Sequence, residues 1–381
     1  MESTMKTLFI ISKGMDKPPD EVLEKLEREN RKKRDRMLEK EISATVLDER
    51  YIAGENGWFK KRLYRLIPVT VAQIIETLLV HKKYDVVYVY YEKAGFPLSV
   101  CFRYLKIKTP LVMMVSRITS GDKRKASLKK WLVKHGEKGV SSYIIWSSVQ
   151  QKIAVRDLQI PQSKIRPINR GTDQRFWHYI PCKTDMISSA GMEMRDYPTL
   201  VKALKPLNIP CHIATGVQRG ELFNTVSNLY EMDEIPEHIS IGRKSLEELR
   251  ELYARSRFVV VPILPTDSDN GLTTILEAMA MGKPVIYSKV QGQVDIVKDG
   301  ITGIPVRPED PDAMRNAIVE LWNNPRLAAE MGREARRYIE QEQRQEDAVA
   351  SIKYELQRAV NQNREPAGNP VYRKSSVTPV D

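Results

Sequence analysis

Short apolar runs alternate with longer segments of helical spacing along most of the 381 residues. Residues 85–91 are largely apolar, which is typical of a strand buried on both faces of a parallel sheet. Residues 69–81 lie just before them and repeat apolar side chains at helical spacing. This alternation predicts a doubly wound α/β fold.

The other expected elements follow the same order. In the first half we expect strands at 7–12, 42–47, 110–115 and 142–147, and helices at 19–41, 96–105 and 126–135. In the second half we expect strands at 185–190, 211–215, 238–241, 257–262 and 284–288. The helices expected there are 197–207, 246–256, one within 265–284, 311–323 and 325–358.

The alternation stops once, at residues 161–183, and then restarts. We therefore predict two Rossmann-like domains, at 1–170 and 171–345, followed by a helix at 346–362 that packs back toward the first domain. The polar tail at 363–381 contains three prolines and is expected to be disordered. Two such domains in tandem place a ligand in a central cleft, at the C-terminal ends of the strands.

The sequence contains no pattern for a membrane span or a metal site. No run of 18 or more apolar residues is present. The first strand begins without a signal-peptide pattern, so we expect a cytoplasmic protein. The three cysteines lie far apart and the five histidines show no paired spacing, so we assign none of them to a metal.

Positive charge is concentrated in the first half of the chain. Residues 1–180 carry 36 lysines and arginines against 20 acidic residues, a net of +16, whereas the whole chain has a net charge of +12. This excess predicts an anionic partner for the first half, which could be a membrane surface, a lipid phosphate or a nucleic acid.

Residues 265–284 carry the pattern of an anion-binding site. They follow the apolar run 258–262, open with turn formers around Gly271 and then become helical. The first N–H groups of a helix have no partner within it, so a phosphate can bind there. Asp269 lies at this helix mouth, and Glu277 follows about two turns later. Two acids around such a helix start suit a ligand with phosphate and hydroxyl groups, which describes a nucleotide sugar.

Four motifs of the second half support this interpretation. Asp269 and Glu277, followed by A-M-A-M-G-K-P, are similar to an E-x7-E signature. Residues 299–306 read D-G-I-T-G-I-P-V, and residues 195–200 read R-D-Y-P-T-L. Residues 170–173, R-G-T-D, are similar to an N-G-V-D linker motif that Phe176 completes. In this order the motifs resemble those of GT-B glycosyltransferases of the retaining type, typified by glycosyltransferase family 4.

The resemblance implies a GT-B fold, no resident cofactor, and roles for individual residues. Glu277 would bind the ribose hydroxyls of the donor, and Asp269 would hold hydroxyls of the transferred sugar. Arg195 would neutralise the departing diphosphate, so that no metal ion is needed. The remaining donor-binding groups would come from Gly271, Leu272, Thr273, Thr274, Gly14, Thr215, Gly216 and Gly242.

The sequence departs from the family pattern at three positions. The first acid is Asp269 instead of glutamate, which shortens its reach to the sugar. Met192 replaces an arginine of the first C-domain loop, so a second cation is expected from Lys13, Arg117 or elsewhere. Ser116 stands where many relatives have a histidine. The candidate catalytic residues are Asp269, Arg195, Glu92, Ser116 and Arg117.

Two basic stretches of the first half also contain tryptophan. Residues 121–138 carry seven lysines and arginines against two acids, with Leu128 and Trp131 at helical spacing, and residues 58–66 have the same character. Amphipathic basic helices predict contact with an anionic membrane. The alternative is a surface helix whose Leu and Trp face the sheet. The residues expected at a membrane or acceptor surface are Trp58, Lys60, Lys61, Arg62, Lys129, Lys130, Trp131 and Lys134.

Together these features favour a retaining, metal-independent hexosyltransferase. It would bind a nucleotide sugar and transfer the sugar to a lipid-linked or membrane-associated acceptor, as a peripheral protein at the inner face of the cell membrane. Two alternatives stay open. One is an enzyme that glycosylates nucleic acid, or a nucleic-acid-binding protein; the other is a nucleotide-sugar epimerase or hydrolase. A scaffold with a vestigial site is disfavoured, because both donor-site acids are present.

Overall fold

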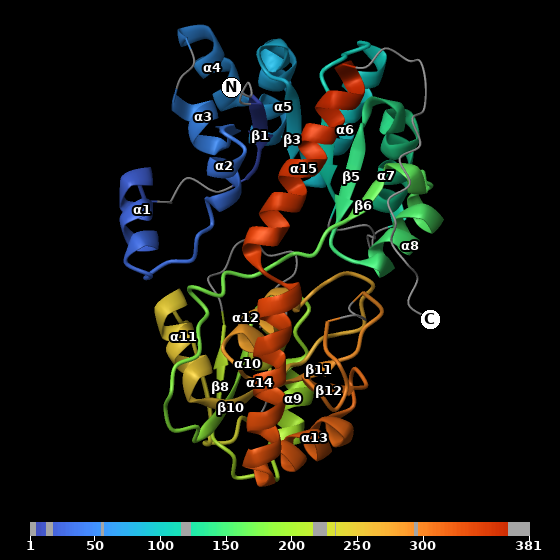
Figure 1. Ribbon diagram of the computed structural model, residues 1–381. Helices are drawn as coiled ribbons and strands as arrows, with labels where there is room; N and C mark the ends of the chain where they lie inside the picture. Colours follow the sequence, from blue (N-terminus) through green and yellow to red (C-terminus); the bar gives the residue numbers. More distant parts are fainter. Residues whose placement is uncertain are drawn as a thin grey trace, which may run out of the picture.

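The computed structural model describes residues 5–12, 18–54, 57–115, 123–215, 227–232, 234–292 and 296–364. Within these ranges the named strands form two six-stranded sheets, and all their pairings are parallel. Figure 1 shows two lobes, one built on each sheet, which we call the first and second lobe. The α/β architecture predicted from the sequence is confirmed.

The first sheet has the strand order β2-β1-β3-β4-β5-β6. Its strands are β1 (Thr7–Ile10), β2 (Ala44–Leu47), β3 (Val86–Val89), β4 (Leu111–Met114), β5 (Ser142–Ile145) and β6 (Ile165–Pro167). Every residue of β1, β3, β4 and β5 is buried, which explains why these strands read as continuous apolar runs. The strand order reverses direction at β1, and ligand sites of such sheets lie beside this reversal.

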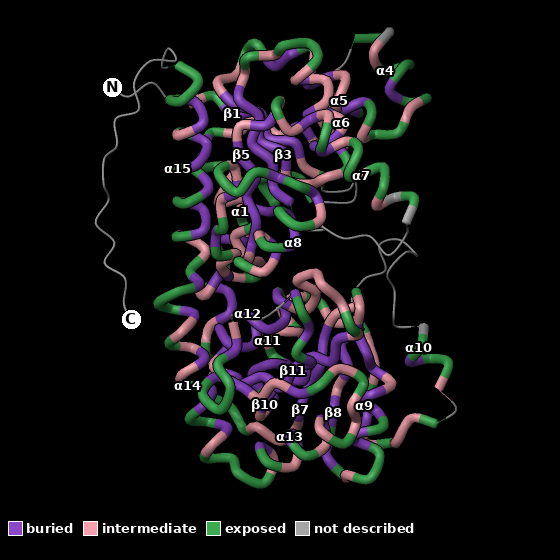
Figure 2. Tube along the Cα trace, turned by 90° about the vertical axis from the view of Figure 1, so that its right-hand side faces the viewer, coloured by how far each residue is buried: buried purple, intermediate pink, exposed green. Residues whose placement is uncertain are grey.

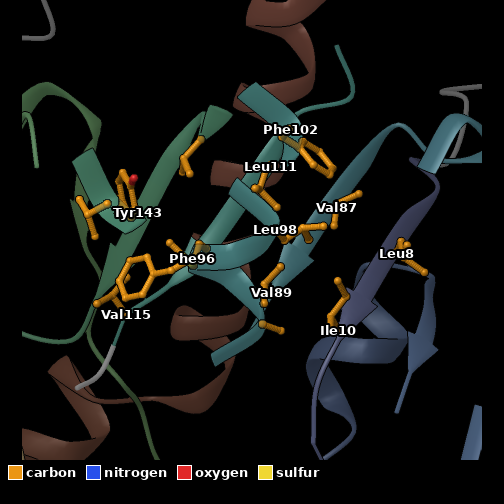
Figure 3. Packing of buried hydrophobic residues seen from close by; sticks show 14 of the residues in the cluster. Leu8, Ile10, Val87, Val89, Phe96, Leu98, Phe102, Leu111, Val115 and Tyr143 are labelled. Carbon is orange, nitrogen blue, oxygen red and sulfur yellow. The ribbon is translucent and has the colours of Figure 1, made fainter. Parts of the chain in front are cut away.

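Helices cover both faces of the first sheet. They are α1 (Asp20–Arg28), α2 (Met37–Glu41), α3 (Glu49–Gly54), α4 (Trp58–Leu66), α5 (Val69–Val80), α6 (Glu92–Tyr104), α7 (Lys123–Gly136) and α8 (Ser148–Leu158). Because side chains alternate along a strand, neighbours face different layers. Val87 and Val89 pack with Leu98 of α6 (Figure 3). Phe9 and Tyr88 face the opposite layer, which includes α15 (Gln345–Arg364).

The second sheet has the order β12-β11-β10-β7-β8-β9. Its strands are β7 (Met186–Ala190), β8 (Cys211–Ala214), β9 (Ile239–Gly242), β10 (Ser256–Val261), β11 (Val285–Ser288) and β12 (Gly303–Val306). The helices are α9 (Tyr197–Leu204), α10 (Ser227–Tyr230), α11 (Leu246–Arg255), α12 (Leu272–Ala280), α13 (Pro311–Asn323) and α14 (Pro325–Glu342). Buried clusters lie on both faces of this sheet.

The chain passes between the lobes twice, and the two crossings touch. It runs forward through the segment after β6 and returns where α14 ends and α15 begins. Thr172 on the forward crossing accepts a hydrogen bond from the Gln345 N–H at 3.1 Å and donates to the Gln343 carbonyl at 2.9 Å. In Figure 1 α15 starts beside the end of α14 and runs up across the first lobe.

Two expected long helices are each divided in the structure. The helix expected at 19–41 is α1 and α2, separated by residues 29–36, where Asn30 adopts a left-handed φ of 55°. The helix expected at 325–358 breaks after Glu342. Helical spacing continues through both breaks, but polar contacts with the other lobe interrupt each helix. Residues 363 and 364, expected in the tail, end α15, and 365–381 lie outside the described residues.

Five elements were missing from the sequence prediction: the helices α3, α8 and α10 and the strands β6 and β12. Pro167 lies in β6, and Pro305 lies in β12. Each of these strands is at an edge of its sheet, where a residue without an N–H is tolerated. No helix among the described residues is both long enough and apolar enough to cross a bilayer.

Candidate active site

Helix α12 begins at the junction between the lobes, and its start is shaped by the loop that precedes it. Gly271 is the N-cap residue with φ of 85°, a left-handed conformation that costs a side-chain-bearing residue free energy. The Leu272 N–H donates to the Asp269 carbonyl at 3.1 Å, which folds the acid back over the helix mouth. Thr273 lines the cleft between the lobes, whereas Leu272 and Thr274 are buried.

Glu277 lies inside α12 and is 6% exposed. Burial raises the pKa of its carboxyl group to about 7, although Lys33 and Arg170 lower it and Asp35 raises it. The Lys33 ammonium lies 3.9 Å from Glu277 Oε1. A buried carboxylate with a nearby lysine is suited to accept hydrogen bonds from hydroxyl groups.

Asp269 lies at the helix mouth opposite the first lobe. Burial raises the pKa of its carboxyl group, Arg170 opposes this, and the charge of Glu92 raises the pKa further. Arg170 Nη1 lies 3.5 Å from Asp269 Oδ2. The charge of Glu92, in the first lobe, therefore acts on Asp269 of the second lobe. Glu92 is the first residue of α6 and follows β3 by two residues.

Arg170 pairs with Asp269, and its charge also lowers the pKa of Glu277. Its guanidinium also lies 5.8 Å from the ring centroid of Trp146, at the end of β5, within the range of a cation–π contact. We missed Arg170 as a site residue because the linker motif that contains it resembles one with asparagine at this position.

Arg195 occupies a different place from the one expected. It is 4% exposed, and its guanidinium donates to the carbonyls of Ala190 at 2.9 Å and Glu193 at 2.9 Å, and to Thr274 Oγ1 at 3.0 Å. Gly191 leaves room for it, because an added Cβ would lie 2.3 Å from Arg195 Nη2. Arg195 does not line the cleft. These contacts favour a role in holding the loop after β7 against α12 over direct contact with a phosphate.

A cleft of about 830 Å³ lies between the lobes at this site. Both lobes contribute charged side chains to it, among them Lys33, Arg170 and Glu277. Asp173 and Thr172 of the forward crossing line this cleft together with residues of α15. The volume lies within the range of sites that bind small molecules.

The remaining predicted donor-site residues fall into two groups. Thr215 and Gly242 lie together at the C-terminal edge of the second sheet, where the Thr215 N–H donates to the Gly242 carbonyl at 3.1 Å. Gly14, Ser116, Arg117 and Gly216 lie outside the described residues, as does Lys13. No group of three or more His, Cys, Asp or Glu side chains in the described ranges could hold a metal ion.

Helix α4 turns one side inward and the other to the solvent. Lys60 Nζ donates to Glu76 Oε2 at 2.8 Å, and the Tyr64 hydroxyl donates to the same oxygen at 2.7 Å. Lys60 was predicted at an outer surface, but its ammonium is bound to a buried carboxylate and so does not belong to that surface. The outward side carries Lys61 and Arg62, with Trp58 77% exposed.

Helix α7 presents a second exposed surface of the same kind. Leu128 and Trp131 are 59% and 51% exposed, so they do not face the sheet. Val133 of this helix is buried in the core of the first lobe. The basic residues Lys129, Lys130 and Lys134 lie on the same helix. Figure 2 shows α4 and α7 on the side of the first lobe opposite α15.

Comparison with known proteins places this geometry among glycosyltransferases. Residues 194–324 match the family described as glycosyl transferases group 1. The UDP-Gal:alpha-D-GlcNAc-diphosphoundecaprenol alpha-1,3-galactosyltransferase of Escherichia coli is 23% identical over 273 residues, 65% of this chain and 68% of that protein. The GDP-mannose-dependent alpha-(1-6)-phosphatidylinositol monomannoside mannosyltransferase of Mycolicibacterium smegmatis is 29% identical over 160 residues, 40% of this chain and 41% of that protein. Matches to four curated relatives span only 18% to 41% of each relative's length.

Solved structures of low sequence identity share the fold across nearly the whole chain. Sucrose-phosphate synthase from Thermosynechococcus elongatus superposes with a TM-score of 0.72 at 15% identity, covering 94% of this chain and 100% of that one. Anabaena HepE in complex with UDP-glucose gives 0.67 at 17% identity, covering 94% and 100%. The fold is GT-B, and the resemblance to this group of glycosyltransferases, expected from the sequence, is confirmed.

Proposed function

We propose that this protein is a glycosyltransferase that moves a sugar from a nucleotide-sugar donor to an acceptor. The observation that carries the proposal is the position of Glu277 and Asp269. Asp269 lies in the loop just before α12 and is partly buried, whereas Glu277 lies within α12, is buried and lines the interlobe cleft. Lys33 lies beside Glu277, and Arg170 lies beside Asp269.

Each group at this helix mouth has a chemical role in the proposal. Glu277 accepts hydrogen bonds from the ribose hydroxyls of the donor, and Asp269 accepts them from the transferred sugar. The first N–H groups of α12 meet the diphosphate, whose negative charge grows as the bond to the sugar breaks. Arg195 supports this arrangement from beneath by binding Thr274. Transfer with retention and without a metal ion is part of the proposal.

The acceptor is proposed to lie at an anionic membrane, on a lipid-linked glycan. The exposed Trp58 of α4 and Trp131 of α7 support this, because each lies on a helix rich in lysine and arginine. Two of the similar proteins carry diphosphoundecaprenol or phosphatidylinositol monomannoside in their names. The protein would then be peripheral, at the inner face of the cell membrane.

A thermal-shift screen of UDP-, GDP- and ADP-sugars tests donor binding. A donor that binds only the folded state raises the melting temperature by mass action. Glu277→Gln should abolish the shift, while Glu320→Gln on the exposed side of α13 keeps it. The proposal fails if no nucleotide sugar shifts the wild-type protein, or if Glu277→Gln responds like wild type.

Transfer itself is tested by supplying the identified donor with vesicles that contain polyprenyl-diphosphate-linked sugar. Sugar transfer to the lipid supports the acceptor assignment, and the anomeric configuration of the product reports retention. Donor consumption without any acceptor would instead support an epimerase or hydrolase. Binding of duplex nucleic acid with a steep salt dependence would support the nucleic-acid alternative.

A further inference from the structure

Residues 29–36, between α1 and α2 of the first lobe, reach over to contact the second lobe and form what we call the strap. At one end Arg31 Nε lies 3.1 Å from Glu247 Oε1 of α11. Next to it, Arg250 Nη1 donates to the Asn30 carbonyl at 2.9 Å. At the other end Gln345 Nε2 donates to the Arg34 carbonyl at 2.8 Å. The strap is thus fixed to the second lobe at Asn30 and Arg31, and to α15 at Arg34.

Lys33 lies within this fixed segment and extends into the interlobe cleft. Its ammonium is 3.9 Å from Glu277 Oε1 and 3.8 Å from Asp35 Oδ1. The Lys33 side chain is 31% exposed, whereas that of Glu277 is 8% exposed. A separation of 3.9 Å is an ion pair without a hydrogen bond, so the carboxylate oxygens keep their capacity to accept from a ligand.

The charged groups around Glu277 come from three parts of the chain. Lys33 and Asp35 come from the strap, Arg170 from the crossing segment and Arg195 from the start of the α9 region. The three cations favour the ionised carboxylate, while Asp35 and burial oppose it. Burial outweighs them, and the pKa of Glu277 lies at about 7, so the carboxyl group is partly protonated at neutral pH. Lys33 is the strongest of the opposing charges.

We propose that Lys33 is a positioning residue of the donor site, which the strap carries from the first lobe to keep Glu277 ionised. A protonated Glu277 can accept fewer hydrogen bonds from the two hydroxyls of a ribose than the ionised carboxylate can. The proposal rests on the proposed function, because it assigns Glu277 to the donor. The proposal adds that a lysine of the first lobe controls the ionisation of a carboxyl group buried in the second lobe.

The test compares Lys33→Met with Lys25→Met. Lys25 lies on α1 outside the lining of the cleft, and its exposed ammonium is 3.9 Å from Glu29 Oε1. Circular dichroism and thermal melting confirm that both variants fold. The dissociation constant of the donor found in the screen is then measured from about pH 6 to about pH 9, across the ionisation of Glu277.

We expect wild-type affinity to fall as the pH drops through about 7, where Glu277 becomes protonated. In Lys33→Met this fall begins at higher pH, so the dissociation constant rises about threefold or more at neutral pH and approaches wild type near pH 9. Lys33→Arg should restore the wild-type profile, and Lys25→Met should match it. A Lys33→Met profile identical to wild type, or displaced equally at all pH values, overturns the proposal.

A second measurement separates this inference from the proposed function. The carboxyl carbon of Glu277 is titrated by NMR without any ligand, in protein labelled at glutamate, and Glu277→Gln identifies its signal. Lys33→Met should raise the titration midpoint, and an unchanged midpoint overturns the inference even if donors bind. Failure of every nucleotide sugar to bind, with a raised midpoint, would reject the donor assignment and with it the positioning role.

Discussion

Asp173 accepts three hydrogen bonds from Arg34, a residue that lies 139 positions earlier in the chain and on the other lobe. The Arg34 N–H donates to Oδ2 at 2.7 Å, and the guanidinium donates to Oδ1 at 3.1 and 2.6 Å. Arg34 also pairs with Glu346 of α15 at 2.8 Å. One arginine therefore fastens the strap, the forward crossing and the returning helix to each other.

Arg34→Met should destabilise the protein by about 3 kcal/mol, because it leaves the carboxylate of Asp173 buried without its cation. Asp173 is 4% exposed, so water cannot replace the lost donors without rearrangement. Urea denaturation measures the change. Arg31→Met is the matched control, because its partner Glu247 is exposed, and its unfolding midpoint should stay at the wild-type value.

The same pair predicts a pH dependence. Burial would raise the pKa of Asp173, but the hydrogen bonds and charge of Arg34 outweigh it, and the net pKa lies below the ordinary 3.8. A lowered pKa stabilises the folded state above that ordinary value, and the stabilisation is lost as the pH falls through the lowered pKa. Acid denaturation of wild type and Arg34→Met should therefore converge at low pH. A constant difference down to the lowest pH would contradict this.

Glu277→Gln should remove donor binding and yet stabilise the protein at alkaline pH. The folded-state pKa of Glu277, about 7, is above the ordinary 4.5. The wild-type protein therefore loses stability as the pH rises from 4.5 to about 7. The glutamine has no charge to bury, and the gain should reach up to about 3 kcal/mol. Melting curves at about pH 5 and about pH 8.5 measure it, with Glu320→Gln as the control. A glutamine variant no more stable than wild type at the higher pH would contradict the assigned burial.

Arg195→Met should lower the stability of the protein and slow sugar transfer. It should leave the affinity for the diphosphate of the donor largely unchanged. The substitution leaves the Ala190 and Glu193 carbonyls and Thr274 without their donor, at a cost of about 2–4 kcal/mol. Because these groups hold the loop after β7 to α12, Thr274→Val should show a smaller effect of the same kind. A fully stable Arg195→Met protein that loses diphosphate affinity alone would restore the phosphate-binding role.

Removal of the outward tryptophan of α4 should weaken binding to anionic vesicles. Trp58→Ala should reduce the vesicle-bound fraction about tenfold, because a largely exposed indole is the apolar part of this surface. Lys61→Glu with Arg62→Glu should act similarly, at about 1 kcal/mol for each cation removed. Flotation with phosphatidylglycerol vesicles measures both. Tyr354→Ala, on α15 at 71% exposure, is the control, and equal flotation of all variants would rule out this surface.

The sequence was sufficient for most of the strands and helices and for the positions of the two acids in the chain. Asp269 and Glu277 are eight positions apart on one strand-turn-helix unit, so local spacing determines where they lie. Lys33 and Arg170 could not be predicted in the same way, because contacts between the lobes bring them to the acids. The sequence motif identified Arg195 but did not predict its contacts, because spacing does not reveal which carbonyls a buried guanidinium binds.

The surface helices show the same limit on a smaller scale. Helical spacing puts Lys60 beside other basic residues of α4, and nothing local indicates that Glu76 of the next helix binds it. For α7 the spacing left two orientations open, and packing of Val133 into the core decides between them. Amphipathic spacing identifies a helix face, but its partner in the fold determines where that face points.

The return of α15 to the first lobe has a consequence for synthesis on the ribosome. Ile352 and Leu356 belong to the same buried cluster as Phe9, Tyr88 and the other residues on one face of the first sheet. That face is translated early, yet it stays uncovered until the last helix emerges. The nascent first lobe therefore exposes an apolar sheet surface throughout translation of the second lobe, a state that favours aggregation and binding by chaperones.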